Sequence, residues 1–404
     1  MASATREKIG LWTAVIIGVN SVIGAGIFAT TSLLGSKVGP AGILTYLFAF
    51  TAIWFIAQSF ARVAYLYPQE GSFYNYTKQW GGHCLGLIAG GAYLLGVLTA
   101  MGLLSKVVSQ YMHNLAPSIS AMHFGLFTIL LLTALNLAGA AISKVGQYIL
   151  IAFTLYPLFV TTILCLTNID LANLTPFMPN GMSSVFAGTK VAVFGLFGFE
   201  TITSLFNIVE KPEQNVPQAL RRAMLIIGVI YLFFIGSILL GIPQAIFHNH
   251  PNITIPQALH LIFPNHFMLI QSVAFSIIFS IMGTIHAVMW GSSELILSYF
   301  SLSRSANIKN LLTKNIINQK TAVLIAGSVI LTVFLTIENL SVFFSLTDVC
   351  LLFAFITSIT SLLFVKEEWK SGQNYITILG LISALTIFTI ALQTMINNLV
   401  MWLK

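Results

Sequence analysis

The sequence predicts an all-α polytopic membrane protein with about eleven membrane-spanning helices. Of its 404 residues, 57% are hydrophobic and only 7% are charged, whereas soluble proteins average about 25% charged residues. The hydrophobic residues are grouped in long stretches, and a helix needs about 20 apolar residues to cross a bilayer. The connections between these stretches are short, so the sequence indicates one membrane domain and no soluble domain.

Eleven apolar segments are long enough to be spans. In order they are Leu11–Leu34, Ile43–Leu66, Leu85–His113, Phe124–Ile142, Gly146–Leu166, Val185–Val209, Met224–Phe247, Phe267–Phe300, Ala322–Ile337, Ser341–Val365 and Tyr375–Leu403. The first is too long for the apolar region of a signal peptide and lacks a cleavage pattern, so we treat it as a retained span. The eighth is longer than one span, and we expect its tail from Ser292 to form an amphipathic helix at the cytoplasmic surface.

The positions of lysine and arginine predict the orientation, because cytoplasmic loops of membrane proteins are enriched in both. With the N-terminus inside, fourteen of the eighteen basic residues lie in cytoplasmic segments: Arg6, Lys8, Arg62, Lys78, Lys144, Lys211, Arg221, Arg222, Arg304, Lys309, Lys314, Lys320, Lys366 and Lys370. Lys37 and Lys404 then lie outside, and Lys106 and Lys190 lie within spans. The prediction is a cytoplasmic N-terminus and an external C-terminus.

Several classes of function are disfavoured by the same residues. The net charge of +7 comes from basic residues in separate short loops, which do not form the continuous patch that nucleic acid requires. Cys84, Cys165 and Cys350 are far apart and have neither metal-ligand nor disulfide spacing. No serine–histidine–aspartate set or HExxH motif is apparent. We therefore expect no enzyme activity, no cofactor and no metal.

The first span is interrupted at its middle. Within Gly18–Phe28, the polar pair Asn20 and Ser21 precedes Gly24 and Gly26. Glycine costs about 1 kcal/mol relative to alanine inside a helix, and backbone loosened inside a membrane normally lines a cavity or packs on protein. The pattern predicts a broken helix whose free amides and carbonyls could bind a small zwitterion. A close helix contact through small residues is the alternative.

The sixth span carries a matching interruption. The segment Val193–Thr201 is apolar but contains Gly195, Gly198 and the ionisable Glu200. Spans one and six are equivalent in a five-plus-five arrangement, and five spans per repeat give the halves opposite orientations. The sequence therefore predicts an inverted repeat, with halves at residues 1–168 and 183–365 and an additional helix at 375–403. Paired interruptions of this kind indicate the binding site of a transporter.

Three motifs then resemble a known family, the amino acid–polyamine–organocation (APC) transporters, and within it the basic amino acid/polyamine antiporter branch. The motifs are Val22-Ile-Gly-Ala-Gly-Ile-Phe28; Tyr67-Pro-Gln-Glu-Gly-Ser-Phe-Tyr-Asn-Tyr76 with Gly86 and Gly90-Gly-Ala-Tyr93; and Phe197-Gly-Phe-Glu200 with Val209-Glu-Lys-Pro-Glu-Gln-Asn-Val-Pro-Gln-Ala219. Their order and spacing fit from residue 8 to about 365. The resemblance implies substrate binding between broken helices one and six, beside helices three and eight.

The resemblance also implies the site residues. The candidate substrate-binding residues are Val22, Ile23, Gly24, Ala25, Gly26, Tyr93, Met101, Phe194, Phe197 and His286. The amides of Ala25 and Gly26 would meet a carboxylate at the positive end of a half-helix, and the carbonyls of Val22, Phe194 and Phe197 would accept an amino group. Phe194 corresponds to a gating aromatic residue, and Glu200 to a proton-sensing glutamate.

Some positions depart from the antiporters or admit a purely structural role. Met101 replaces an amide that reads a guanidinium group, His286 replaces a tryptophan, and Thr154 stands where some proton-coupled relatives have a lysine. Glu200 could instead be a protonated, hydrogen-bonded carboxyl group, and His286 a hydrogen-bonded interior histidine. Tyr93 could simply pack. We expect Lys106 to extend its ammonium group towards the surface rather than contact substrate.

Together these observations predict a secondary active transporter of amino acids or related amines. It would work by alternating access, as an antiporter or a proton-coupled symporter; the alternative is an amino acid sensor with a transporter fold that does not transport. The expected partners are the small-molecule substrate, the lipid bilayer, a proton and a second copy in a homodimer. The expected location is a bacterial inner membrane.

Overall fold

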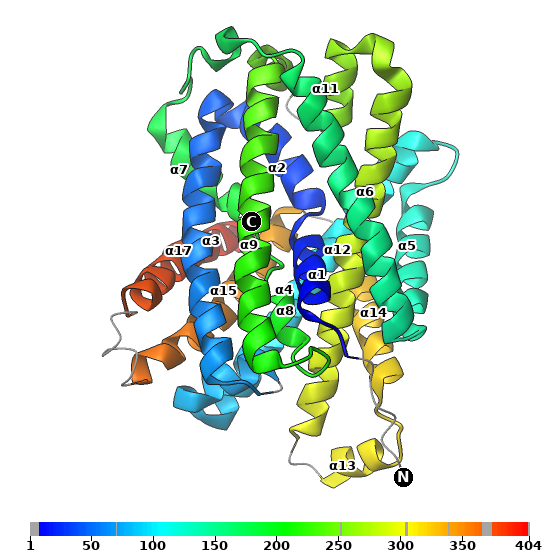
Figure 1. Ribbon diagram of the computed structural model, residues 1–404, viewed down its shortest axis with the longest axis vertical. Coiled ribbons are helices and arrows are strands. Elements are labelled where there is room, and N and C mark those ends of the chain that lie inside the picture. The colour runs from blue at the N-terminus through cyan, green and yellow to red at the C-terminus, as the bar shows by residue number, and fades with distance from the viewer. Residues whose placement is uncertain are drawn as a thin grey trace.

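The computed structural model describes residues 8–69, 71–250, 253–303, 306–337, 340–365 and 374–402, which form a bundle of long helices (Figure 1). The first half contains α1 (Leu11–Val22), α2 (Ala25–Lys37), η1 (Gly39–Ala41), α3 (Gly42–Leu66), α4 (Ser72–Leu115), α5 (Ala121–Leu137) and α6 (Ala140–Leu166). The second half contains η2 (Leu171–Leu174), α7 (Gly181–Phe194), α8 (Thr201–Ser204), α9 (Pro212–Gly241), α10 (Gln244–Asn249), α11 (Ile255–Ile262), η3 (Pro264–His266), α12 (Phe267–Ser301), α13 (Ala306–Thr313), α14 (Gln319–Thr336), α15 (Leu340–Thr360) and η4 (Ser361–Phe364), and α17 (Asn374–Trp402) follows.

The helices account for all eleven predicted spans. In the described part of the chain, nine helical segments are long and apolar enough to cross a membrane. The fourth predicted span is the shorter apolar helix α5, and the sixth is divided between α7 and α8, each too short to span alone. Five of the basic residues used to predict the orientation lie outside the described residues: Arg6, Arg304, Lys366, Lys370 and Lys404.

The expected amphipathic tail of the eighth span is wrong. α12 runs without interruption to Ser301, and its residues remain buried beyond Ser292 as far as Ser298. Its 35 residues give a length of about 52 Å, so the helix continues past the roughly 30 Å hydrocarbon core. It stays buried because α4 and α8 pack against it. The helix that lacks buried residues is the separate α13.

Helix packing repeats between the two halves. α4 packs against α15, and its counterpart α12 packs against α6. Likewise α1 packs against α9 as α7 packs against α3, and α4 against α5 as α12 against α14. If each helix is replaced by the helix five spans away along the sequence, the first contact of each pair becomes the second. This is the pattern expected of two repeats of five spans. α17 lies outside this core, against α3 and α15.

The two predicted helix breaks are present and touch each other. α1 ends at Val22 and α2 begins at Ala25, while α7 ends at Phe194 and helix resumes only at α8. A Cβ atom on Gly26 would lie 2.7 Å from the Cα atom of Gly195 in the other break. Gly198 has a φ of +118° and faces the carbonyl group of Ser21. Glycine is required at both positions because the backbones meet with no room for a side chain.

Hydroxyl groups from neighbouring helices bind the carbonyl groups that the breaks release. On α12, Thr284 donates to the carbonyl oxygen of Asn20 at 2.7 Å and Ser280 to that of Ile23 at 3.1 Å. On α9, the hydroxyl of Tyr231 donates to the carbonyl oxygen of Gly195 at 2.9 Å. A broken helix has unpaired backbone groups at each new end, and these hydroxyl groups satisfy several of them away from water.

We predict that Gly26→Ala destabilises the protein whereas Gly91→Ala does not. The new methyl group at position 26 would meet backbone rather than a mobile side chain, and overpacking typically costs about 1–3 kcal/mol. Gly91 lies in α4, and a Cβ atom added there would have no neighbouring atom within 4 Å, so alanine should be neutral or slightly stabilising. Thermal unfolding of both purified variants in detergent measures the difference, and equal melting temperatures would show that the breaks do not touch.

We also predict that Tyr231→Phe destabilises the protein more than Tyr148→Phe does. The first change leaves the buried carbonyl of Gly195 without its donor, and an unsatisfied buried group costs about 1–3 kcal/mol. The hydroxyl of Tyr148 pairs with Thr13, but the Tyr148 side chain is 44% exposed, so its loss should matter less. The comparison uses the same unfolding assay, and a larger effect at Tyr148 would contradict our account of the break.

Candidate functional site

A small cavity lies where the two helix breaks meet. Its volume is about 40 Å³, close to the roughly 30 Å³ that one water molecule occupies in the liquid. The cavity is lined from both breaks and from α4, α12 and α15 by Ser21, Val22, Gly24, Gly26, Val97, Ala100, Met101, Leu104, Phe194, Phe197, Gly198, Glu200, Thr284, Val288, Thr347 and Leu351. Ligand pockets usually measure about 300–1,000 Å³, so the walls would have to move apart to admit a ligand larger than water.

The first break presents the N-terminal end of a half-helix to the cavity. α2 begins at Ala25, and its N-cap residue Gly24 offers no side chain to the first amide groups. The opening N–H groups of a helix have no partner within the helix, and the helix dipole adds partial positive charge there. Gly24 and Gly26 both line the cavity. This end can therefore hold an anionic group such as a carboxylate.

The second break contributes the only acidic side chain among the residues that line the cavity. Glu200 is fully buried, and its Oε2 atom accepts a hydrogen bond from the backbone N–H of Gly198 at 2.9 Å. Within the described part of the chain, its Oε1 atom has no hydrogen-bond partner. A buried carboxyl group is costly unless it carries a proton or meets a cation. One oxygen is thus fixed by the break and the other can bind a proton or an ammonium group.

Most of the remaining wall is apolar. Val97, Met101 and Leu104 come from α4, and Leu351 comes from α15. The exception on α15 is Thr347, whose buried hydroxyl has no partner among the described residues. Sequence reasoning missed the contribution of α15, because a threonine in a continuous apolar span carries no signal of the direction it faces.

The structure brings together six of the ten predicted substrate-binding residues as cavity lining: Val22, Gly24, Gly26, Met101, Phe194 and Phe197. Ile23 lies in the first break without lining the cavity. Ala25 is the first residue of α2, and its side chain lies outside the described part of the structure. Tyr93 is not a lining residue either, and its ring stacks on Phe73 with a centroid distance of 3.9 Å.

His286 also lies outside the cavity lining. Thr284 and Val288, on either side of it in α12, line the cavity, whereas residues two apart on a helix point to different faces. The Nδ1 atom of His286 lies 2.6 Å from the Nε2 atom of Gln147 on α6. The histidine therefore sits in the contact between α6 and α12, behind the cavity wall.

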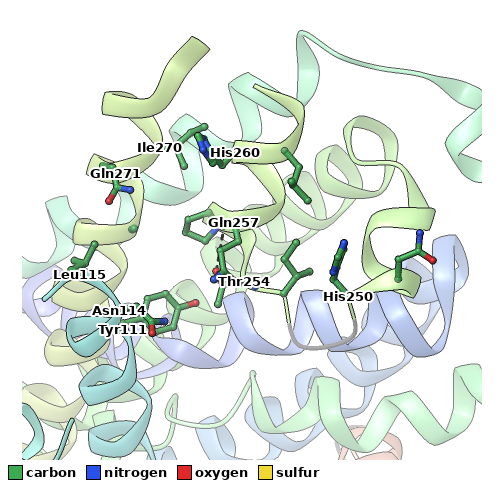
Figure 2. Close-up of a pocket in the computed structure, with 14 residues that line it drawn as sticks. Tyr111, Asn114, Leu115, His250, Thr254, Gln257, His260, Ile270 and Gln271 are labelled. Carbon is green, nitrogen blue, oxygen red and sulfur yellow. Dashed lines mark hydrogen bonds between the residues drawn. The ribbon is translucent and has the colours of Figure 1, made fainter. Parts of the chain in front are cut away.

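A larger pocket of about 770 Å³ opens at the end of the bundle opposite α13 (Figures 1 and 2). Figure 2 shows its walls at the end of α4, along α11 and at the start of α12, with Tyr111, Asn114, Gln257 and Gln271 among them. None of its lining residues belongs to a helix break or carries a formal charge. Its size alone does not make it the substrate site, because it lacks the paired backbone groups of the breaks.

Comparison with known proteins places the chain among transporters. The model of the amino acid permease family matches residues 9–402. Similar curated proteins include the branched-chain amino acid permease BcaP of Bacillus subtilis, 24% identical over 61% of this chain and 58% of that protein. The gamma-aminobutyric acid permease of Escherichia coli is 24% identical over 56% and 52%, and cationic amino acid transporter 5 of Arabidopsis thaliana is 27% identical over 54% and 42%. The matches thus span about half the length of these relatives.

Among solved structures, the crystal structure of MhsT in complex with L-phenylalanine is similar in fold. Its TM-score is 0.67 over 96% of this chain and 100% of that chain, at 13% identity. This likeness concerns the fold alone, and it confirms the predicted polytopic bundle of two five-helix repeats. The predicted resemblance to the APC superfamily is confirmed as well, although the relatives do not single out the antiporter branch. The protein is an integral membrane protein, and because the family model covers nearly the whole chain, it belongs to the amino acid permease family.

Proposed function

We propose that this protein is a secondary active transporter of amino acids or related amines that works by alternating access. The observation that carries the proposal is the meeting of two broken helices around a buried cavity that holds one carboxyl group. The proposal includes a cytoplasmic N-terminus in a bacterial inner membrane, repeats at residues 1–168 and 183–365, and α17 as an added helix available for a homodimer contact.

The backbone of the two breaks would bind the part common to all amino acids. The substrate carboxylate would bind the amide groups of Ala25 and Gly26, where α2 begins without a capping side chain. Its amino group would bind the carbonyl groups of Val22, Phe194 and Phe197. The hydroxyl of Tyr231 lies 3.4 Å from the Val22 oxygen, farther than from the Gly195 oxygen, so the Val22 carbonyl keeps most of its capacity to accept a hydrogen bond.

The side-chain part of the pocket would select among amino acids. Met101, Val97 and Leu351 provide apolar wall. These three side chains offer a guanidinium group no hydrogen-bond partner, so burying the group against them would be costly. We therefore favour uncharged side chains over arginine or agmatine. Glu200 would link the cycle to a proton or to the substrate's ammonium group through its unpartnered oxygen, as an antiporter or a proton symporter.

The transport function predicts exchange of amino acids across the membrane. Proteoliposomes loaded with an unlabelled amino acid should accumulate the same labelled amino acid by counterflow, without any other driving force. We expect this for one or more uncharged amino acids in a panel. Arginine and agmatine should give no exchange, because Met101 stands where a guanidinium group would need a polar partner. Saturable binding without counterflow for every compound would instead favour a sensor that does not transport, and exchange of arginine would contradict the apolar pocket.

The proposed coupling role of Glu200 predicts how uptake depends on pH. Glu200→Gln should abolish the pH dependence of uptake in proteoliposomes while substrate binding survives, because the amide keeps the size and polarity of the side chain but cannot exchange a proton. Glu213→Gln is the matched control, since Glu213 is exposed in the first turn of α9, and it should retain the pH dependence. Unchanged pH dependence in Glu200→Gln would remove Glu200 from the coupling mechanism.

A further inference from the structure

Three buried polar side chains join α1, α6 and α12 behind the cavity. The Nδ2 atom of Asn20 donates to the side-chain Oε1 atom of Gln147 at 2.8 Å and to its backbone oxygen at 3.0 Å. The Nε2 atom of Gln147 then lies 2.6 Å from Nδ1 of His286. All three side chains are at most 1% exposed. Burying polar side chains inside a membrane is costly, so three that are hydrogen-bonded across three helices usually serve a function.

The hydrogen bonds that link Asn20, Gln147 and His286 have a defined donor-to-acceptor direction. Because Oε1 of Gln147 accepts from Asn20, its Nε2 group must donate to His286, and Nδ1 of His286 must accept. The ring of neutral His286 therefore carries its hydrogen on Nε2. Among the described residues this Nε2 has no hydrogen-bond partner. It faces Gly146, where a Cβ atom would lie 4.0 Å away.

Protonation of His286 would reverse the donor-to-acceptor direction of these hydrogen bonds. Both ring nitrogens of a charged histidine are donors, so Nδ1–H would require the amide of Gln147 to turn its oxygen towards the ring. The Nε2 group of Gln147 would then face Asn20, which must turn its unpartnered Oδ1 atom inward. The two hydrogen bonds that Asn20 donates to Gln147 are replaced by one that Gln147 donates to Asn20. The connection between α1 and α6 is therefore weaker when His286 is charged.

This connection acts directly on the first helix break. Asn20 lies two residues before the end of α1 and next to Ser21, which lines the cavity. Its backbone oxygen is also held by Thr284 of α12 at 2.7 Å. The end of α1 is thus fixed by one residue to both α6 and α12, and the reversal would weaken its connection to α6 while the contact with α12 remains.

We propose that Asn20, Gln147 and His286 form a proton-operated link in which proton uptake by His286 loosens α1 from α6 and allows the first break to move. The proposal rests on the transport function proposed above and adds a second protonation site to Glu200. His286 is then a positioning residue, acting on the break through Gln147, rather than a substrate-binding residue.

No charged group competes for His286 in the described part of the chain. Gln147 is its one hydrogen-bond partner and it makes no ion pair there. α1 and α8 carry no titratable side chain. The titratable residues on the other helices packed against α12, and on α12 itself, are Lys37, Tyr74, Tyr76, Lys78, His83, Cys84, Tyr93, Lys106, Tyr111, His113, His123, Lys144, Tyr148, Tyr156, Cys165, His260, His266, Glu294, Tyr299, Lys309 and Lys320. None of them is a hydrogen-bond partner of His286 among the described residues. Glu200 belongs to the cavity side, where α12 presents Thr284 and Val288. The proton that charges His286 binds Nδ1 once the Gln147 amide has turned, and water that accepts from Nε2–H beside Gly146 would stabilise the charged ring.

The test measures how readily a cysteine at the break is modified. Ser21→Cys is introduced after Cys84, Cys165 and Cys350 have been replaced by serine, and a small methanethiosulfonate reagent is applied to proteoliposomes at acidic and neutral pH. The rate ratio between the two pH values is compared between this background and His286→Gln, so the thiol chemistry cancels. Acid lowers the thiolate fraction and so slows the intrinsic reaction. In the background, labelling at acidic pH should nevertheless be faster than this smaller thiolate fraction alone would give, and this relative acceleration is the signal of the link. His286→Gln keeps an acceptor for Gln147 but cannot be charged, and it should lose this acceleration.

A second variant keeps the proposal testable if His286→Gln does not fold. Gly146→Ala has room for its methyl group and would cover Nε2, so acid acceleration should require lower pH. Gly236→Ala, whose nearest neighbour would be an isoleucine side-chain atom at 3.8 Å, is the matched control and should behave as the background. The link would be overturned if the ratio of labelling rates at acidic and neutral pH in both His286→Gln and Gly146→Ala equals that of the background. Counterflow in the wild-type protein separates this result from failure of the transport function, which would abolish exchange and leave the labelling difference in place.

Discussion

The structure depends on satisfying the backbone groups that two broken helices release in the middle of a membrane. No water is available in the hydrocarbon core, so each orphaned carbonyl or amide needs a partner from the protein. Thr284 and Ser280 of α12 serve the first break, and Tyr231 of α9 serves the second. These hydroxyl groups explain why α9 and α12 pack against the breaks. The amides at the start of α2 remain without a side-chain cap, and that is where a ligand can contribute most.

Direct backbone contact between the breaks determines the shape of the site. Gly26 lies against Gly195, and Gly198 lies against Ser21, so no side chain separates the two half-helices. The cavity therefore remains small and is bounded on two sides by backbone. We propose that these backbone groups bind the carboxylate and amino group that all amino acids share. Discrimination among amino acids would then come from the facing helices, where α4 provides mainly apolar side chains.

Much of this architecture could be predicted from the sequence, because bilayer thickness fixes span length and glycines beside polar residues mark the breaks. The cavity position of Glu200 and Met101 followed from the same reasoning together with the family resemblance. The partners of the breaks could not be predicted: Tyr231 and Thr347 sit in spans that are apolar on every face, so no periodicity shows which way they point. The extended burial of α12 was missed because serines at 292 and 293 read as surface residues, whereas packed neighbours bury them.

The placement of His286 shows how a polar residue can serve the site without touching the ligand. A substrate-binding histidine would share a helix face with Thr284 and Val288, but the ring instead contacts Gln147 on α6. The arrangement separates two tasks that a single cavity residue would have to combine. Glu200 lines the cavity, whereas the hydrogen bonds among Asn20, Gln147 and His286 lie where α1 is anchored to α6 and α12. Because these hydrogen bonds reach Asn20, a change of charge at α12 alters the hydrogen bonds of the same helix end whose backbone forms the site.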